Sequence, residues 1–128
     1  MEPLRVLVID DDWEVLEALS DMLSFIGHRV TAVRTVLEGK YALAWREPQV
    51  VVTDLNLAGE LSIELLEHAR DRHPEIGRVL LTGSFPHDRS VIIARSLVHV
   101  ALSKPVSASE LRQAIELARA HASEDAKH

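Results

Sequence analysis

Four short apolar runs recur along the chain, and charge rarely interrupts them. They are residues 6–9, 50–53, 79–82 and 98–102. Their β-branched and aliphatic content is typical of strands that are covered on both faces, as in a parallel sheet. Residues 28–33 form a fifth run that includes polar side chains, so this segment fits an edge strand better. The pattern therefore predicts five strands.

Segments with helical patterns lie between these runs. Apolar residues from Val15 to Ile26 keep to one helical stripe, and Gly27 follows where a helix end favours a left-handed residue. Thr35 and Ser107 each begin a Ser/Thr-x-x-Glu sequence, which is typical of a capping box at a helix start. Further helices are expected over residues 60–72, 88–97 and 108–121, followed by a polar, frayed tail over residues 122–128.

Alternating strands and helices indicate the α/β class. Right-handed β-α-β crossovers would place helices on both faces of one doubly wound, five-stranded parallel sheet. The more polar second strand at an edge favours the flavodoxin-like strand order 2-1-3-4-5. In such a sheet, ligands bind beyond the carboxyl ends of the strands.

Length and composition limit the possible classes of protein. A chain of 128 residues with 47% hydrophobic content predicts a single domain, which we place at residues 1–121 with the tail after it. A net charge of −6 argues against direct binding to nucleic acid or to an anionic membrane. The absence of cysteine, of a membrane-length apolar run and of a signal-peptide pattern leads us to expect a cytoplasmic protein.

Polar residues end four of the predicted strands. These ends are Asp10-Asp11-Asp12, Thr53-Asp54, Thr82-Gly83-Ser84 and Ser103-Lys104-Pro105. Two carboxylates about 4 Å apart repel each other by roughly 4 kcal/mol at an effective dielectric of about 20, so such a cluster needs a cation or protonation. Mg²⁺ prefers oxygen ligands of this kind, and Lys104 could pair with a phosphoryl group. We expect Asp12 to serve only as the N-cap of the first helix.

The sequence resembles the response-regulator receiver domain of two-component signalling, in the CheY-like superfamily. The resemblance covers nearly the whole chain through VLVIDDD, VVVTDLNLAG, VLLTGS and LSKPV, in this order. It implies that Asp54 is the phosphoacceptor and also contacts the metal, which would be Mg²⁺, with Mn²⁺ as a possible substitute. Asp11 would be a direct ligand, Asp10 would act largely through coordinated water, and the backbone carbonyl of Asn56 would be a further ligand.

The resemblance also implies how the phosphoryl group is handled. Thr82 would hydrogen-bond its oxygens, and Lys104, before a cis peptide bond to Pro105, would pair with it. The donor would be the phosphohistidine of a histidine kinase or a histidine phosphotransfer protein. A downstream protein would bind the face formed by the last two helices and the fifth strand, and the domain could be a monomer or a phosphorylation-dependent dimer. The chain would be a signalling domain that assists its own phosphotransfer and dephosphorylation, and not an enzyme with a separate substrate.

Three positions depart from the family pattern. Ala101 stands where a switch tyrosine or phenylalanine is usual, Ala58 where proline is usual, and Ser62 where the third helix usually opens with glycine. His99, close to Ala101, is a candidate replacement for the switch side chain, although a structural role is the simpler interpretation. Family members tune the lifetime of the aspartyl phosphate at the positions that Asn56 and Ser84 occupy here.

Two other functions remain open at this point. Asp10-x-Asp12 after an apolar strand also resembles haloacid-dehalogenase-type phosphatases, in which Asp10 would be the nucleophile and Asp12 the acid/base. Against it, Trp13 and Glu14 follow where Gly-Thr is usual, and no later acidic pair supplies metal ligands. The other alternative is a degenerate receiver that binds proteins without accepting phosphate, which the missing aromatic makes less remote.

Overall fold

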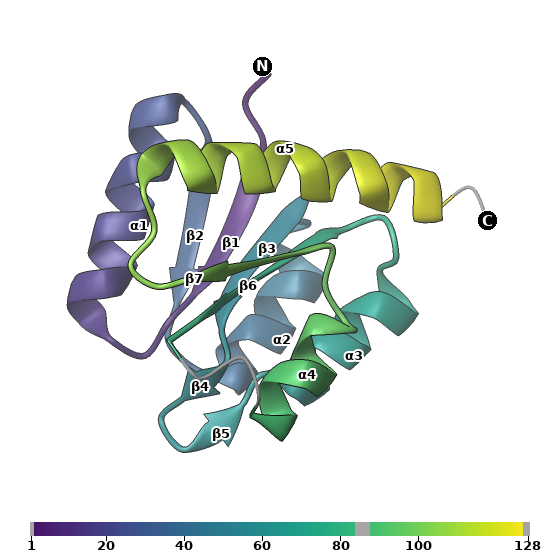
Figure 1. Ribbon diagram of the computed structural model, residues 1–128. Helices are drawn as coiled ribbons and strands as arrows, with labels where there is room; N and C mark the ends of the chain where they lie inside the picture. The colour runs from purple at the N-terminus through teal and green to yellow at the C-terminus, as the bar shows by residue number, and fades with distance from the viewer. Residues whose placement is uncertain (1, 84–87, 127–128) are drawn as a thin grey trace.

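A five-stranded parallel sheet forms the centre of the molecule (Figure 1). The computed structural model describes residues 2–83 and 88–126. The strands are β1 (Arg5–Ile9), β2 (Arg29–Val33), β3 (Val50–Asp54), β6 (Gly77–Thr82) and β7 (Val100–Ser103). They run in the order β2-β1-β3-β6-β7, and every pair is parallel. This is the predicted order, with β2 at one edge.

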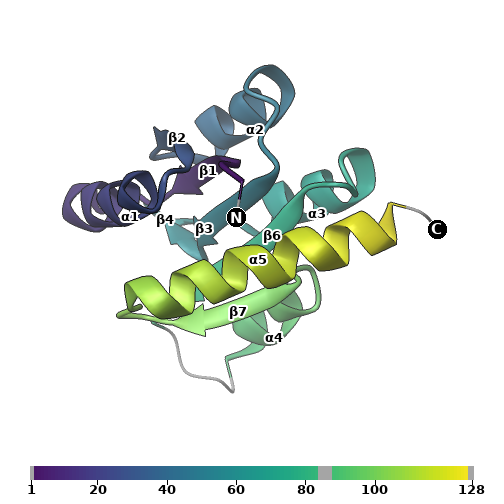
Figure 2. The same ribbon diagram turned by 90° about the horizontal axis from the view of Figure 1, so that it is seen from above.

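Within the described residues, five helices cover the two faces of the sheet (Figure 2). They are α1 (Trp13–Ile26), α2 (Val36–Trp45), α3 (Ile63–Arg72), α4 (Arg89–Arg95) and α5 (Ala108–Asp125). The core between α1, α5 and the sheet is separate from the cores under α2, α3 and α4. None of the helices in the described ranges is both long and apolar enough to cross a bilayer.

The alternating direction of side chains along each strand explains why the strands appear in the sequence as continuous apolar runs. In β1, Val6 and Val8 pack toward α1 and α5, whereas Leu7 and Ile9 pack toward α2 and α3. All four side chains are buried. Successive side chains point to opposite faces, so a strand that is covered on both sides needs apolar residues at every position.

The predicted helix caps are present. Asp12 accepts hydrogen bonds from the N–H groups of Glu14 and Val15, and Ser107 forms a complete capping box with Glu110. Thr35 accepts from the N–H of Glu38, as predicted. The Glu38 carboxylate, however, bonds back to the N–H of Arg34 instead of that of Thr35.

The third helix starts later than predicted. It begins at Ile63 and not at residue 60, because Glu60 and Leu61 form a short strand, β5 (Glu60–Leu61), that pairs antiparallel with β4 (Asn56–Leu57). Ala58 and Gly59 make the turn with φ values of 51° and 89°. The prediction of helix over residues 60–62 was therefore wrong.

The last helix is longer than predicted, and two other boundaries shift. α5 continues to Asp125 instead of ending near His121, because Ala122 is fully buried against the sheet and Asp125 hydrogen-bonds His99. The helix α4 ends at Arg95 and the strand β7 starts at Val100, each two residues inside the predicted bounds. Shifts of this size are usual at the ends of elements.

Two buried imidazoles are held in the neutral state. His28 Nδ1 accepts the N–H of Leu4 and His99 Nδ1 accepts the N–H of Arg78, each at 3.0 Å. A ring nitrogen that accepts a hydrogen bond carries no proton, so Nε2 carries it in both rings. In His99 this Nε2–H donates to the Asp125 carboxylate at 2.8 Å. Burial lowers the pKa of both rings below the usual value of 6.5.

The lowered pKa of these histidines makes stability depend on pH. Below pH 6.5 the unfolded chain binds protons that the folded chain excludes. The stability that the neutral histidines contribute is therefore fully present above the histidine pKa of the unfolded chain, and it is lost as the pH falls from that value toward the lower pKa of the folded chain. We expect the free energy of unfolding, measured with urea, to fall between pH 7.5 and 5.5 (about one unit either side of the ordinary histidine pKa). His28→Asn keeps an acceptor for Leu4 and should reduce that fall. An unchanged pH dependence in this variant would contradict the account.

Gly77 is required where β6 passes under α5. A Cβ added there would lie 2.8 Å from the carbonyl carbon and 2.9 Å from the oxygen of Ala118, which are backbone atoms that no rotamer change can move. We expect Gly77→Ala to lower the free energy of unfolding by about 1–3 kcal/mol. Gly83→Ala is the matched control, since a Cβ added at that position would have nothing within 4 Å. Equal losses in the two variants would disprove the packing argument.

Candidate functional site

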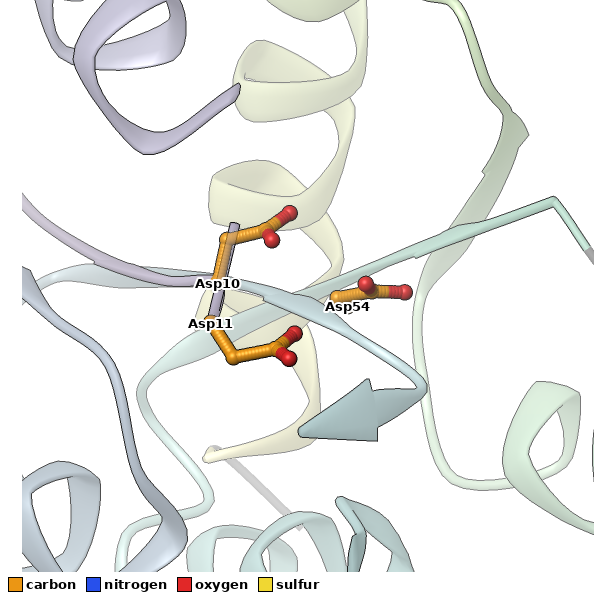
Figure 3. Close-up of side chains that lie close together, drawn as sticks. All are labelled: Asp10, Asp11 and Asp54. Carbon is orange, nitrogen blue, oxygen red and sulfur yellow. The ribbon is translucent and has the colours of Figure 1, made fainter. Parts of the chain in front are cut away.

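Three carboxylates meet at the carboxyl edge of the sheet. Asp10 and Asp11 directly follow β1, and Asp54 is the last residue of the adjacent strand β3. In Figure 3 the carboxylates of Asp10 and Asp11 extend toward Asp54, and one oxygen from each of the three residues lies within 4.8 Å of the others. The structure therefore brings together three of the four predicted metal ligands.

Asp10 is fixed in place by two hydrogen bonds. Its side chain has no exposed surface. Oδ1 accepts the N–H of Asp12 at 2.9 Å, and Oδ2 accepts from Lys104 Nζ at 2.8 Å. Asp11 and Asp54 are only partly buried. Asp10 is therefore held in a fixed position, while the carboxylates of Asp11 and Asp54 are accessible to an incoming ligand.

Lys104 joins the two strands electrostatically. Its ammonium lies 2.8 Å from Asp10 Oδ2 and 3.0 Å from Asp54 Oδ2. Burial acts to lower the pKa of Lys104, but the hydrogen bonds to the two carboxylates outweigh it, and the pKa is raised. The side chain therefore stays charged. The peptide bond between Lys104 and Pro105 is cis, as the family resemblance implies.

Burial raises the pKa of Asp54 above its ordinary value. The hydrogen bond and the charge of Lys104 oppose this shift, the nearby carboxylate of Asp10 adds to it, and the backbone N–H of Asn56 opposes it. The net shift is upward. The reason is that the effect of burial exceeds the compensation that Lys104 provides.

The charges in the pocket leave room for a divalent cation. Three ionised carboxylates and one ammonium sum to −2, and all three acidic side chains offer oxygen atoms. Oxygen-only sites suit Mg²⁺ and Mn²⁺, whereas Zn²⁺ favours histidine and cysteine. The residues present therefore fit Mg²⁺. The carbonyl of Asn56, in β4, remains a predicted ligand.

Thr82 ends β6 at the same edge of the sheet. It is buried, it lies opposite Ser103 in the register of β6 and β7, and its carbonyl accepts the N–H of Lys104 at 3.0 Å. The chain thus places Thr82 beside the lysine, as predicted. Ser84, the other predicted neighbour, lies outside the described residues.

Arg34 lies beside the pocket and is a residue that sequence reasoning missed. Its Nη2 donates to the carbonyl of Asp11 at 2.9 Å, and its guanidinium lies 5.5 Å from the centre of the Trp13 ring. Arg34 directly follows β2, so the rule that ligands bind at strand carboxyl ends would have found it. The polar residues within the second strand make its end a weaker signal than the ends of the apolar strands.

The departures from the family pattern have structural counterparts. Ala101 packs against the core under α4 and offers no side chain that could report on the pocket. His99 is held by Arg78 and Asp125, which agrees with a structural role. Ala58 has a φ of 51°, which proline cannot adopt because its ring fixes φ near −65°. Ser62 is buried and its N–H bonds the carbonyl of Leu55.

The geometry does not favour the phosphatase alternative. That mechanism needs Asp12 in the pocket as the acid/base, but its carboxylate caps α1 and accepts from Glu14 and Val15. Asp54, on a different strand, is the third member of the acidic group.

Comparisons with known proteins identify the family of the chain. The family profile of the response regulator receiver domain matches residues 6–116. The chain belongs to this family. The receiver domain protein from Methanospirillum hungatei JF-1 superposes with a TM-score of 0.86 at 22% identity, covering 96% of this chain and 98% of that one. The signal receiver domain of an HD domain-containing protein from Pseudomonas fluorescens Pf-5 also gives 0.86, at 26% identity, covering 96% and 99%.

Curated relatives are longer regulators. The chain is 33% identical over 118 residues to the response regulator protein FleR of Pseudomonas aeruginosa, covering 92% of this chain and 24% of FleR. It is 32% identical over 110 residues to the photosynthetic apparatus regulatory protein RegA of Rhodobacter capsulatus, covering 86% of this chain and 60% of RegA. The chain therefore spans only part of each relative.

Removing the lysine should leave a buried charge without a partner. We expect Lys104→Met to lower the free energy of unfolding by about 3 kcal/mol, because the wholly buried Asp10 loses its cation. The double variant Asp10→Asn, Lys104→Met should recover much of this loss. Urea unfolding of the wild type, both single variants and the double variant gives the interaction free energy between Asp10 and Lys104. Additive effects would show that the pair contributes nothing specific.

Proposed function

We propose that this domain accepts a phosphoryl group on Asp54 from a phosphohistidine in a Mg²⁺-dependent reaction. The observation that carries the proposal is the junction of Asp54 with Asp10, Asp11 and Lys104 at one edge of the sheet. Receiver domains as a family interact with histidine kinases and downstream effectors, and membership of that family is shown by the profile match.

The transfer exchanges one bond to phosphorus for another. An oxygen of the Asp54 carboxylate attacks the phosphorus atom and a P–O bond forms. The P–N bond to the donor histidine breaks, and its electron pair stays on the imidazole nitrogen, which takes up a proton when the other ring nitrogen does not already carry one. Catalysis of such transfers consists mainly of positioning and charge neutralisation. A bound Mg²⁺, held by Asp11 and Asp54 with Asp10 acting largely through water, would offset charge on the phosphoryl oxygens.

Lys104 and Thr82 would bind the phosphoryl group once it is on Asp54. Lys104 already donates to Asp54, so its ammonium can shift to a phosphoryl oxygen while keeping Asp10 as its second partner. Thr82 would donate its hydroxyl to another oxygen. The domain would also assist loss of the phosphate to water, at a rate that Asn56 and Ser84 tune.

Two surfaces fit the proposed partners. An apolar hollow of about 420 Å³ beside Lys104, lined by Val15, Ala18 and Met22 of α1 and by Pro105 and Val106, would receive the helix that carries the donor histidine. A downstream protein would bind the face of α4, β7 and α5, where large apolar side chains are exposed. These are Ile92, Ile93 and Leu117. We propose a cytoplasmic location for these encounters.

Intact mass spectrometry tests the proposal. With Mg²⁺ and acetyl phosphate, the wild type should gain one phosphoryl group, and Asp54→Asn should gain none. Asp12→Asn is the matched control, because asparagine caps a helix as well as aspartate does and this residue lies outside the pocket. It should still be phosphorylated.

Two results would contradict the proposal. One is an adduct that persists in Asp54→Asn but is lost in Asp10→Asn, as the phosphatase alternative requires because Asp10 would be its nucleophile. The other is no adduct on the wild type with either acetyl phosphate or a phosphohistidine protein, as expected of a degenerate receiver.

A further inference from the structure

Helix α2 has apolar side chains on both sides. Its inner side packs in the core through Val36, Ala42 and Leu43. Its outer side carries Leu37, Tyr41 and Trp45, which are 62%, 60% and 80% exposed. Their i, i+4, i+8 spacing places them on one stripe. A surface helix with a second apolar stripe, here called the α2 stripe (Leu37, Tyr41, Trp45), is typical of an interaction site.

The α2 stripe lies beside the open edge of the sheet. Figure 2 shows α2 next to β2, and within the described ranges β2 pairs with β1 alone. A shallow groove of about 330 Å³ runs between them. It is lined by Thr31, Ala32 and Val33 from the strand and by Glu38, Tyr41, Ala42, Trp45 and Arg46 from the helix and its end. An unpaired edge presents free backbone N–H and C=O groups that favour another chain.

Two opposite charges that line this groove are spaced symmetrically about Ala42 along the chain. Glu38 and Arg46 both line it and are eight residues apart, with Ala42 halfway between them. Thr31, the middle residue of β2, lines the same groove. A two-fold axis that passes near Ala42 therefore brings Glu38 of one copy to Arg46 of the other, twice. This self-complementary pattern selects a second copy of the chain over an unrelated partner.

Both charged side chains are able to make the new contact. Among the residues that the structure describes, Glu38 uses only Oε1, for the N–H of Arg34 and the hydroxyl of Thr35, so Oε2 is open to another donor. Arg46 has no side-chain hydrogen bond or salt bridge to the rest of the chain as far as residues 2–83 and 88–126 are concerned. Its guanidinium would gain its first ion pair in the dimer.

We propose that α2 and the edge strand β2 form a homodimer interface in which a two-fold axis near Ala42 pairs Glu38 of each copy with Arg46 of the other. The two α2 helices then run antiparallel, the exposed rings of Tyr41 and Trp45 are covered, and the open edges of β2 face each other. The contact rests on a groove of about 330 Å³ and three exposed side chains, so we expect a weak dimer that forms at micromolar concentrations. The interface is separate from the phosphorylation pocket and from the face of α4, β7 and α5.

Sedimentation equilibrium of the full chain, from low micromolar to submillimolar concentration, tests the dimer. The wild type should be a reversible dimer. Trp45→Asp should be a monomer with unchanged thermal unfolding, because the ring is 80% exposed in a single copy. Arg89→Glu, a charge reversal at the start of α4, is the matched control and should still dimerise. A wild type that stays monomeric throughout this range would overturn the proposal and leave the α2 stripe for a different partner.

Charge exchange tests the pairing itself. Glu38→Lys and Arg46→Glu each create two like-charge contacts in a homodimer, so each variant alone should self-associate at least about tenfold more weakly than the wild type. An equimolar mixture restores both attractive pairs and should form a heterodimer. Circular dichroism confirms that each variant is folded, which matters for Glu38 because it also caps α2. Failure of two folded variants to associate on mixing would overturn the proposed axis, as would unchanged self-association of Arg46→Glu.

Discussion

The ammonium of Lys104, shared between Asp10 and Asp54, is the interaction on which the site depends. It links the ends of three strands, β1, β3 and β7, that are far apart in sequence. Without it, three carboxylates within 4.8 Å of one another would face mutual repulsion with no internal cation. With it, the pocket keeps a residual charge of −2, which suits a divalent cation and, through that cation, an incoming phosphoryl group.

Much of this site could be predicted because its parts sit at strand ends. Apolar runs locate the strands, parallel strands end at one edge, and the residues that follow them must meet there. The β4–β5 hairpin gave no such signal, since strands of two residues have no periodicity and its turn depends on a left-handed Ala58. The end of α5 depends on the burial of Ala122 and on the contact of Asp125 with His99, which are tertiary features that no local pattern reveals.

The pocket and the outer surfaces follow different constraints. Geometry at the strand ends leaves little freedom in the pocket, and there the chain carries the residue types that its resemblance to receiver domains implies. Away from the pocket, Ala101 in β7 replaces the aromatic that usually reports phosphorylation. On the outer side of α2, Tyr41 and Trp45 are exposed. Under the proposed function, a switch without that aromatic side chain would act through displacement of the backbone or of Thr82 and Lys104, whose main chains are hydrogen-bonded to each other.

Calorimetric titration with Mg²⁺ tests the central claim most directly, because the claim is that the acidic cluster binds a divalent cation through residues from two strands. The account predicts one binding site on the wild type, which Asp11→Asn and Asp54→Asn each weaken strongly and which Asp12→Asn leaves unchanged. Binding that is absent from the wild type, or that depends on Asp12 and not on Asp11 and Asp54, would contradict it.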